Sequence, residues 1–116
     1  MIIYRVCGVD YWGYDYDEHF LVNYSDAMKV FQSLMNKAKE REDVVDREYF
    51  KEEVLKFRED NPDIILEAKY PFMMWKKGDT LYGRVPIWIR TSYEYQEYDI
   101  AGDLIQLKGI YVKEEI

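Results

Sequence analysis

The sequence predicts an α+β protein: an antiparallel sheet of five or six strands, with an αα-hairpin (about residues 25–42 and 47–60) packed on one face. Two observations carry this prediction. β-Branched and aromatic runs separated by turn residues fill both ends of the chain, and apolar residues at helical spacing fill the middle. The length of 116 residues fits a single domain, residues 1–116, with one core.

The N-terminal run IIYRVCGV, residues 2–9, is apolar and rich in β-branched side chains, so it predicts a largely buried strand that Asp10 closes. The segment HFLVNY, residues 19–24, alternates in polarity and predicts a second strand. The two strands would form a hairpin, and the stretch DYWGYDYDEHF, residues 10–20, would be its loop.

Both helices have recognisable starts. Ser25 is a good N-cap, and from Ala27 onward apolar residues recur with the 3.6-residue period of an amphipathic helix. Asp46 can cap the second helix, with Val45 and Phe50 at the two positions of a hydrophobic staple. Pro62 ends this helix, because its ring and missing N–H oppose continuation.

The rest of the chain predicts strands, with a hairpin turn at Lys76–Asp79 in which Gly78 takes the position that needs a positive φ. Pro86 cannot donate a ladder hydrogen bond, so its strand is expected to lie at an edge or to bulge there. The predicted strands cover residues 64–70, 72–75, 80–90 and 103–112.

Composition limits the function classes. The net charge of -7 disfavours free nucleic acid as the main ligand, because a phosphate backbone requires local positive charge. The single cysteine, Cys7, allows no intrachain disulfide, and no run of residues reads as a signal peptide or a membrane span. We therefore expect a cytoplasmic protein that binds no membrane.

Catalytic and metal-binding patterns are weak. His19 is the only histidine, and aligning a calcium loop from Asp15 puts His19 and Phe20 where a ligand and a glycine are required. Cys7 lies in a strand expected to be buried, which favours an inert thiol, and no glycine-rich phosphate loop precedes a helix. We expect no catalytic residues, no metal, no cofactor and no enzymatic activity.

Tyrosine beside acid is the distinctive pattern. It occurs in the stretch 10–18 and again in YEYQEYD, residues 93–99. Tyrosine and tryptophan concentrate in binding loops and interface hot spots, and carboxylates around them select a basic partner. The candidate partner-binding residues are Tyr11, Trp12, Tyr14, Asp15, Tyr16, Asp17, Glu18, Tyr93, Glu94, Tyr95, Glu97, Tyr98 and Asp99.

These features favour a non-enzymatic protein-binding module whose acidic, tyrosine-rich surface blocks a basic, nucleic-acid-handling site on a host protein such as a nuclease or DNA-binding protein. Small size, acidity and the lack of catalytic motifs are typical of host-defence antagonists from phages and mobile elements, of the anti-CRISPR or anti-restriction type, some of which mimic DNA. This is an analogy of type. A homodimer is left open.

Three alternatives stand beside this hypothesis. The tyrosines and acids could form an ordinary solvated surface. Segment 64–90, with five Lys or Arg against two Asp or Glu, interleaves cations with aromatic rings, as proteins that bind single-stranded nucleic acid do. A small carboxylate-dependent enzyme needs only two acids across a cleft, which this composition cannot exclude.

Overall fold

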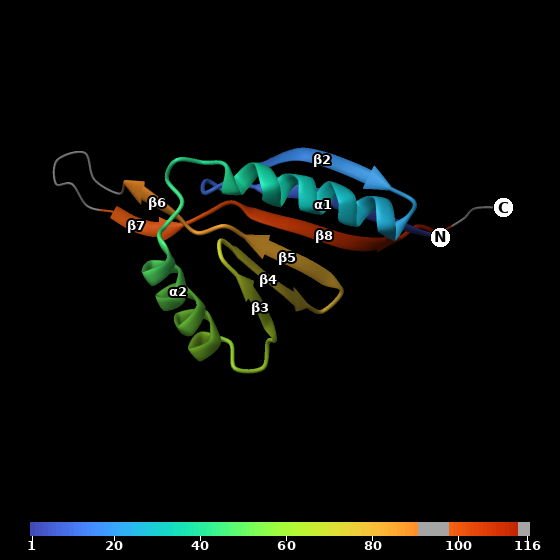
Figure 1. Ribbon diagram of the computed structural model, residues 1–116. Helices are drawn as coiled ribbons and strands as arrows, with labels where there is room; N and C mark the ends of the chain where they lie inside the picture. The colour runs from blue at the N-terminus through green and yellow to red at the C-terminus, as the bar shows by residue number, and fades with distance from the viewer. Residues whose placement is uncertain (91–97, 114–116) are drawn as a thin grey trace.

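The computed structural model describes residues 1–90 and 98–113 and confirms the α+β class (Figure 1). Two helices and eight strands follow one another in these described residues. In order they are β1 (Ile2–Val9), β2 (Asp15–Leu21), α1 (Tyr24–Lys39), α2 (Arg47–Asp60), β3 (Leu66–Lys69), β4 (Phe72–Lys77), β5 (Thr80–Arg84), β6 (Ile87–Arg90), β7 (Tyr98–Ala101) and β8 (Leu104–Tyr111).

Six of the strands form one antiparallel sheet in the order β2-β1-β8-β5-β4-β3. The C-terminal strand β8 pairs with β1 over its whole length, from Ile2 opposite Tyr111 to Val9 opposite Leu104. On its other side β8 pairs with β5, so it joins the β1–β2 hairpin to the three strands β3, β4 and β5. The edges are therefore β2 on one side and β3 on the other. The remaining strands, β6 and β7, pair with each other in a separate two-stranded sheet.

Helix α1 covers one face of the sheet, lying along β1, β2 and β8 (Figure 1). Its buried residues Ala27, Phe31, Leu34 and Met35 pack with Val6, Ile105 and Leu107 of the central strands. Gly83 of β5 allows this close approach. A β-carbon added there would lie 2.6 Å from Met35 Sδ and 2.8 Å from Phe31 Cζ.

Helix α2 packs on the opposite face, so the prediction of both helices on one face is wrong. Phe72 and Met74 of β4 contact the core under α1, whereas Met73 and Trp75 pack with Phe50, Val54 and Phe57 of α2. Neighbouring residues of a strand point to opposite faces, so β4 is covered from both sides. The two helices are thus not an αα-hairpin.

The helix boundaries lie near their predicted positions. The cap of α1 is Asn23 and not Ser25, because the Asn23 side chain accepts a hydrogen bond from the Ser25 amide at 2.8 Å. Asp46 caps α2 as expected, accepting from the Tyr49 amide at 3.1 Å, and Val45 and Phe50 share one core cluster. α1 ends at Lys39, three residues before the predicted end.

The predicted strand 80–90 is interrupted at Val85 and Pro86, where β5 ends and the two-stranded sheet begins. Backbone hydrogen bonds tie β6 to the connection between the helices: Val45 donates to Pro86 at 3.1 Å, and Trp88 donates to Asp43 at 2.8 Å. The turn at Gly78 is as predicted, with φ of 62° between the paired residues Lys77 and Thr80.

In the part of the chain that is described, no helix is long and apolar enough to cross a membrane. Cys7 is fully buried in β1 with a free thiol. Burial raises the pKa of this thiol above its ordinary value of 9.0, so the folded state favours the protonated form. The stability that this pKa shift gives to the folded state is present below pH 9.0 and is lost as the pH rises through the raised pKa of Cys7.

We therefore expect Cys7 to react with a thiol reagent such as DTNB at pH 8 at least about 100-fold more slowly in the native protein than in 6 M guanidinium chloride, because reaction requires a local opening that exposes the thiolate. Absorbance at 412 nm follows the reaction. Equal rates in the two conditions would place Cys7 at the surface and contradict its burial.

Candidate functional site

The β1–β2 connection is shorter than predicted, because β2 begins at Asp15 and takes in much of the expected loop. The loop itself is Asp10–Tyr14. The Asp10 carboxylate accepts hydrogen bonds from the Trp12 amide at 3.0 Å and the Tyr14 amide at 2.9 Å, and the Asp10 amide donates to the Tyr14 carbonyl at 2.9 Å. Gly13 turns the chain with φ of 86°. The loop is thus held by its own hydrogen bonds.

Three aromatic side chains of this loop are largely exposed: Tyr11 at 56%, Trp12 at 79% and Tyr14 at 72%. The rings of Tyr11 and Trp12 meet edge to face, with centroids 5.2 Å apart. Solvating such large rings is unfavourable, and a group of them is more costly than scattered single residues. We call Tyr11, Trp12 and Tyr14 the aromatic tip.

The carboxylates behind the aromatic tip are largely engaged within the chain. Arg5 Nη2 lies 2.7 Å from Asp15 and 2.6 Å from Glu18. The hydrogen bond to Glu18, followed by that to Asp15, raises the pKa of Arg5. Lys37 Nζ lies 3.9 Å from Asp17, whose φ of 48° marks an irregularity in β2. The negative field is therefore weaker than the count of acids indicates.

Tyr16 lies on the face that α1 covers and is half-buried, unlike the aromatic tip. Its hydroxyl donates a hydrogen bond to Asp103 at 2.6 Å, and its ring packs over Gly8. Burial, followed by the hydrogen bond to Asp103, raises the pKa of Tyr16 far above its ordinary value. Tyr16 thus supports the loop from within and offers little surface to a partner.

A pocket of about 500 Å³ lies beside the aromatic tip. Arg41 is held at its rim by two hydrogen bonds to Asp43, both 2.9 Å, which raise the pKa of Arg41 and lower that of Asp43. The two arginines and two aspartates in the lining give a mixed polar wall. The lining residues are Asp10, Tyr11, Trp12, Arg41, Ile87, Ile89, Arg90 and Asp103.

The structure connects the first tyrosine-rich stretch to Asp103, which lies four residues beyond the second stretch, 93–99. Asp103 joins the first stretch through Tyr16, and in β7 Tyr98 is 57% exposed while Asp99 is exposed as well. The other candidates of the second stretch lie outside the described residues; they are Tyr93, Glu94, Tyr95 and Glu97.

Arg5 and Arg41 are parts of this site that the sequence reasoning missed. A signal existed for Arg5, which is the one charged residue in an otherwise apolar strand. Its guanidinium lies at the sheet surface between two carboxylates of the neighbouring strand. No comparable signal marks Arg41, because a cation near the end of a helix usually serves the helix dipole.

The basic segment 64–90 does not present a row of stacking rings. Trp75 stacks on Tyr82 with centroids 5.7 Å apart and contacts Phe57 of α2 at 4.7 Å, while Trp88 contacts Tyr49 at 4.7 Å. All of these aromatic side chains except Tyr49 are partly buried, and their rings are covered by the neighbouring rings.

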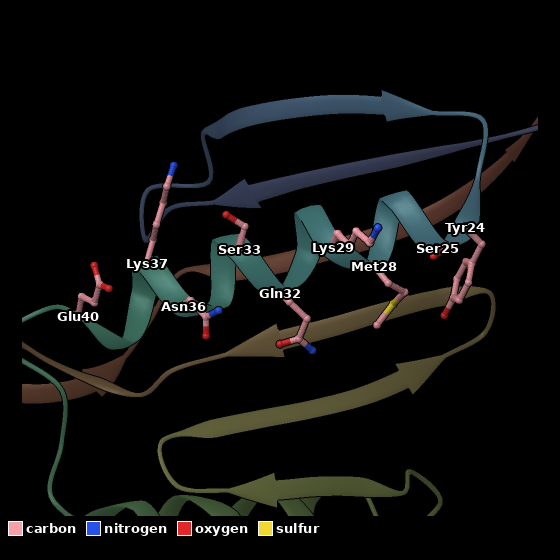
Figure 2. Close-up of a pocket in the computed structure, with 9 residues that line it drawn as sticks. All are labelled: Tyr24, Ser25, Met28, Lys29, Gln32, Ser33, Asn36, Lys37 and Glu40. Carbon is pink, nitrogen blue, oxygen red and sulfur yellow. The ribbon is translucent and has the colours of Figure 1, made fainter.

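In residues 1–90 and 98–113, no group of three or more His, Cys, Asp or Glu is placed to hold a metal ion. A hollow of about 780 Å³ is lined only by α1 and Glu40, with Lys37 and Gln32 on opposite sides of the helix (Figure 2). A hollow on the outside of a single helix does not converge polar groups on one point.

Comparisons of the chain with protein-family models, with curated proteins and with solved structures found no match.

Proposed function

We propose that this protein is a non-enzymatic protein-binding module that covers a basic, nucleic-acid-handling site on a host protein, in the manner of a small inhibitor from a phage or mobile element. The observation that carries the proposal is the aromatic tip. Tyr11, Trp12 and Tyr14 are each more than half exposed on a loop whose backbone is tied to Asp10. A preorganised loop loses little entropy when it binds, and such rings supply most of the energy in many interfaces.

The carboxylates around the tip have a secondary role in this proposal. Asp15, Asp17 and Glu18 keep about half of their side-chain surface exposed despite their cation partners. They can orient the module on a basic surface and speed its capture, while the aromatic tip provides the binding energy. These separate roles explain why exposed aromatic rings lie beside acids that are partly neutralised by cations of the same chain.

To test the proposal, the immobilised protein is exposed to purified nucleases and DNA-binding proteins, with and without a competing DNA duplex. We expect at least one of them to bind and the duplex to displace it. Replacing Trp12 and Tyr14 together by alanine should weaken binding at least about 30-fold, the loss of a typical hot spot. Tyr111→Ala is the matched control, because Tyr111 is 77% exposed at the far end of the sheet.

Charge is tested separately with Asp17→Asn, since asparagine also tolerates the positive φ at this position. We expect a roughly two- to fivefold slower association at low salt and little effect at 500 mM NaCl, where surface charges are screened.

Two results would refute the proposed mode of binding through the aromatic tip to a nucleic-acid-handling site. One is full binding by the Trp12 and Tyr14 double variant, and the other is no competition by the DNA duplex.

A further inference from the structure

The edge strand β3 is the second surface that the fold leaves open, at the opposite side of the sheet from β2. It pairs with β4 on its inner side, and no other described strand pairs with its outer side. Glu67, Ala68 and Lys69 are exposed, and Ile65, just before the strand, is 86% exposed. Outward backbone groups of an edge strand can pair with an added strand.

Hollows flank β3 on both of its faces. On the face of α1, one of about 260 Å³ lies between Gln32, Lys69 and Phe72, and one of about 210 Å³ lies between Ile65, Met74 and Leu81. On the face of α2, one of about 360 Å³ lies between Phe50, Val54, Leu55 and Ala68. Each is several times the volume of about 30 Å³ that a water molecule takes up in the liquid.

This arrangement matches what an added strand needs. Successive side chains of a strand point to opposite faces, so three consecutive apolar residues of a bound segment would enter the three hollows in turn. The backbone would contribute the ladder hydrogen bonds and the hollows the preference for side chains. Leu55, 59% exposed on α2, extends the apolar surface beside this strand.

The charges around the hollows decide the class of partner. Four cations line them, Lys51 and Arg58 on one face and Lys69 and Lys76 on the other, against the single carboxylate of Glu67. This basic rim lies on a protein of net charge -7. Two copies paired through β3 would bring like charges together, which disfavours a second copy as the occupant.

We propose that β3 is a docking edge for an extended segment of a partner protein, in which three consecutive apolar residues are flanked by Asp or Glu. The segment adds a strand to the sheet beside β3, and its carboxylates meet the lysines and arginine of the rim. This surface is separate from the aromatic tip, which lies on the connection to the opposite edge strand.

The β2 edge differs from the β3 edge in the regularity of its strand pairing and in its backbone conformation. Its pairing with β1 is irregular between Val6 and Gly8, and Asp17 within it has a positive φ. Irregular pairing and acidic side chains are ways in which proteins protect sheet edges. The β3 edge has regular pairing throughout its four residues, so a docking strand is expected there and not at β2.

The test uses the labelled peptide DEVIVED, its basic counterpart KRVIVRK and the proline variant DEVPVED, followed by fluorescence polarisation at 50 mM NaCl. We expect DEVIVED alone to bind, because the basic rim repels KRVIVRK and proline removes a backbone donor. Backbone amide shifts in NMR spectra should concentrate on Glu67, Ala68 and Lys69.

Variants then locate the site. Ala68→Phe, which fills the hollow beside α2, should abolish binding, and Lys69→Glu with Lys76→Glu should weaken it about tenfold. Lys108→Glu, an exposed cation on β8, should bind like wild type, as should the Trp12 and Tyr14 double variant, which separates this proposal from the proposed function. Circular dichroism confirms that each variant is folded.

Several results would overturn the proposal. Equal binding of KRVIVRK would remove the charge argument, and full binding by a folded Ala68→Phe would place the peptide elsewhere. Dimerisation of the free protein that Ala68→Phe abolishes, seen by sedimentation, would assign the edge to a second copy. Displacement of DEVIVED by a single-stranded oligonucleotide with the same shifts at Glu67, Ala68 and Lys69 would assign it to nucleic acid.

Discussion

Replacing Phe31 by alanine is expected to lower the free energy of unfolding by about 3 to 5 kcal/mol. Phe31 is fully buried at the centre of the contact between α1 and the sheet, and its Cζ lies close to the backbone of Gly83. Removing the ring loses its transfer free energy and leaves a cavity that a rigid sheet cannot close. A domain of this size has about 5 to 15 kcal/mol in total, so the loss is a large fraction.

Urea denaturation followed by circular dichroism measures this change. Leu55→Ala is the matched control, since Leu55 is 59% exposed on α2 and its truncation should cost no more than about 0.5 kcal/mol. A loss below about 1 kcal/mol for Phe31→Ala would mean that α1 is not held on the sheet by this side chain.

Replacing Gly8 by alanine is expected to destabilise the protein by about 2 to 4 kcal/mol, a large effect for one added methyl group. A β-carbon at Gly8 would lie 2.3 Å from Tyr16 Cζ and 2.6 Å from the Tyr16 hydroxyl. The ring must move away, and the hydrogen bond of 2.6 Å from Tyr16 to Asp103 breaks. The cost combines overpacking with the loss of a hydrogen bond to a charged acceptor.

A double-mutant cycle identifies the cause. With Tyr16→Ala already in place, adding Gly8→Ala should cost less than about 1 kcal/mol, because the ring with which it collides is gone. Tyr16→Phe alone keeps the ring and isolates the hydrogen bond, with an expected loss of about 1.5 to 3 kcal/mol. Additive effects of Gly8→Ala and Tyr16→Ala would show that the collision is not the reason.

The sequence predicted the helix bounds well, because the residues that start and end a helix lie within a few residues of those bounds. Asp46 and Val45 mark the start of α2, and Pro62 marks its end, within one or two residues of the observed bounds. The prediction that both helices pack on one face of the sheet was wrong. Phe72 to Trp75 are all apolar, which in retrospect indicates a strand covered on both faces, since one-sided burial would leave alternate residues polar.

The candidate site was predictable only in part. An exposed, aromatic connection after β1 follows from the sequence of residues 10–14, because turn residues interrupt a run of strand formers. The partners of the acids were not predictable, since Arg5 is 10 and 13 residues from Asp15 and Glu18, and Asp103 is 87 residues from Tyr16. Only strand register places such residues beside each other.

Composition and periodicity alone determined that this chain forms two helices and an antiparallel sheet, because those signals act between residues that are neighbours in the sequence. The tertiary structure decided which side chains remain available to a partner. It left Trp12 in solvent, turned Tyr16 inward and placed Arg5 between two carboxylates, and it left the β3 edge open. These outcomes depend on contacts between distant segments, whose geometry is set by how strands and helices pack.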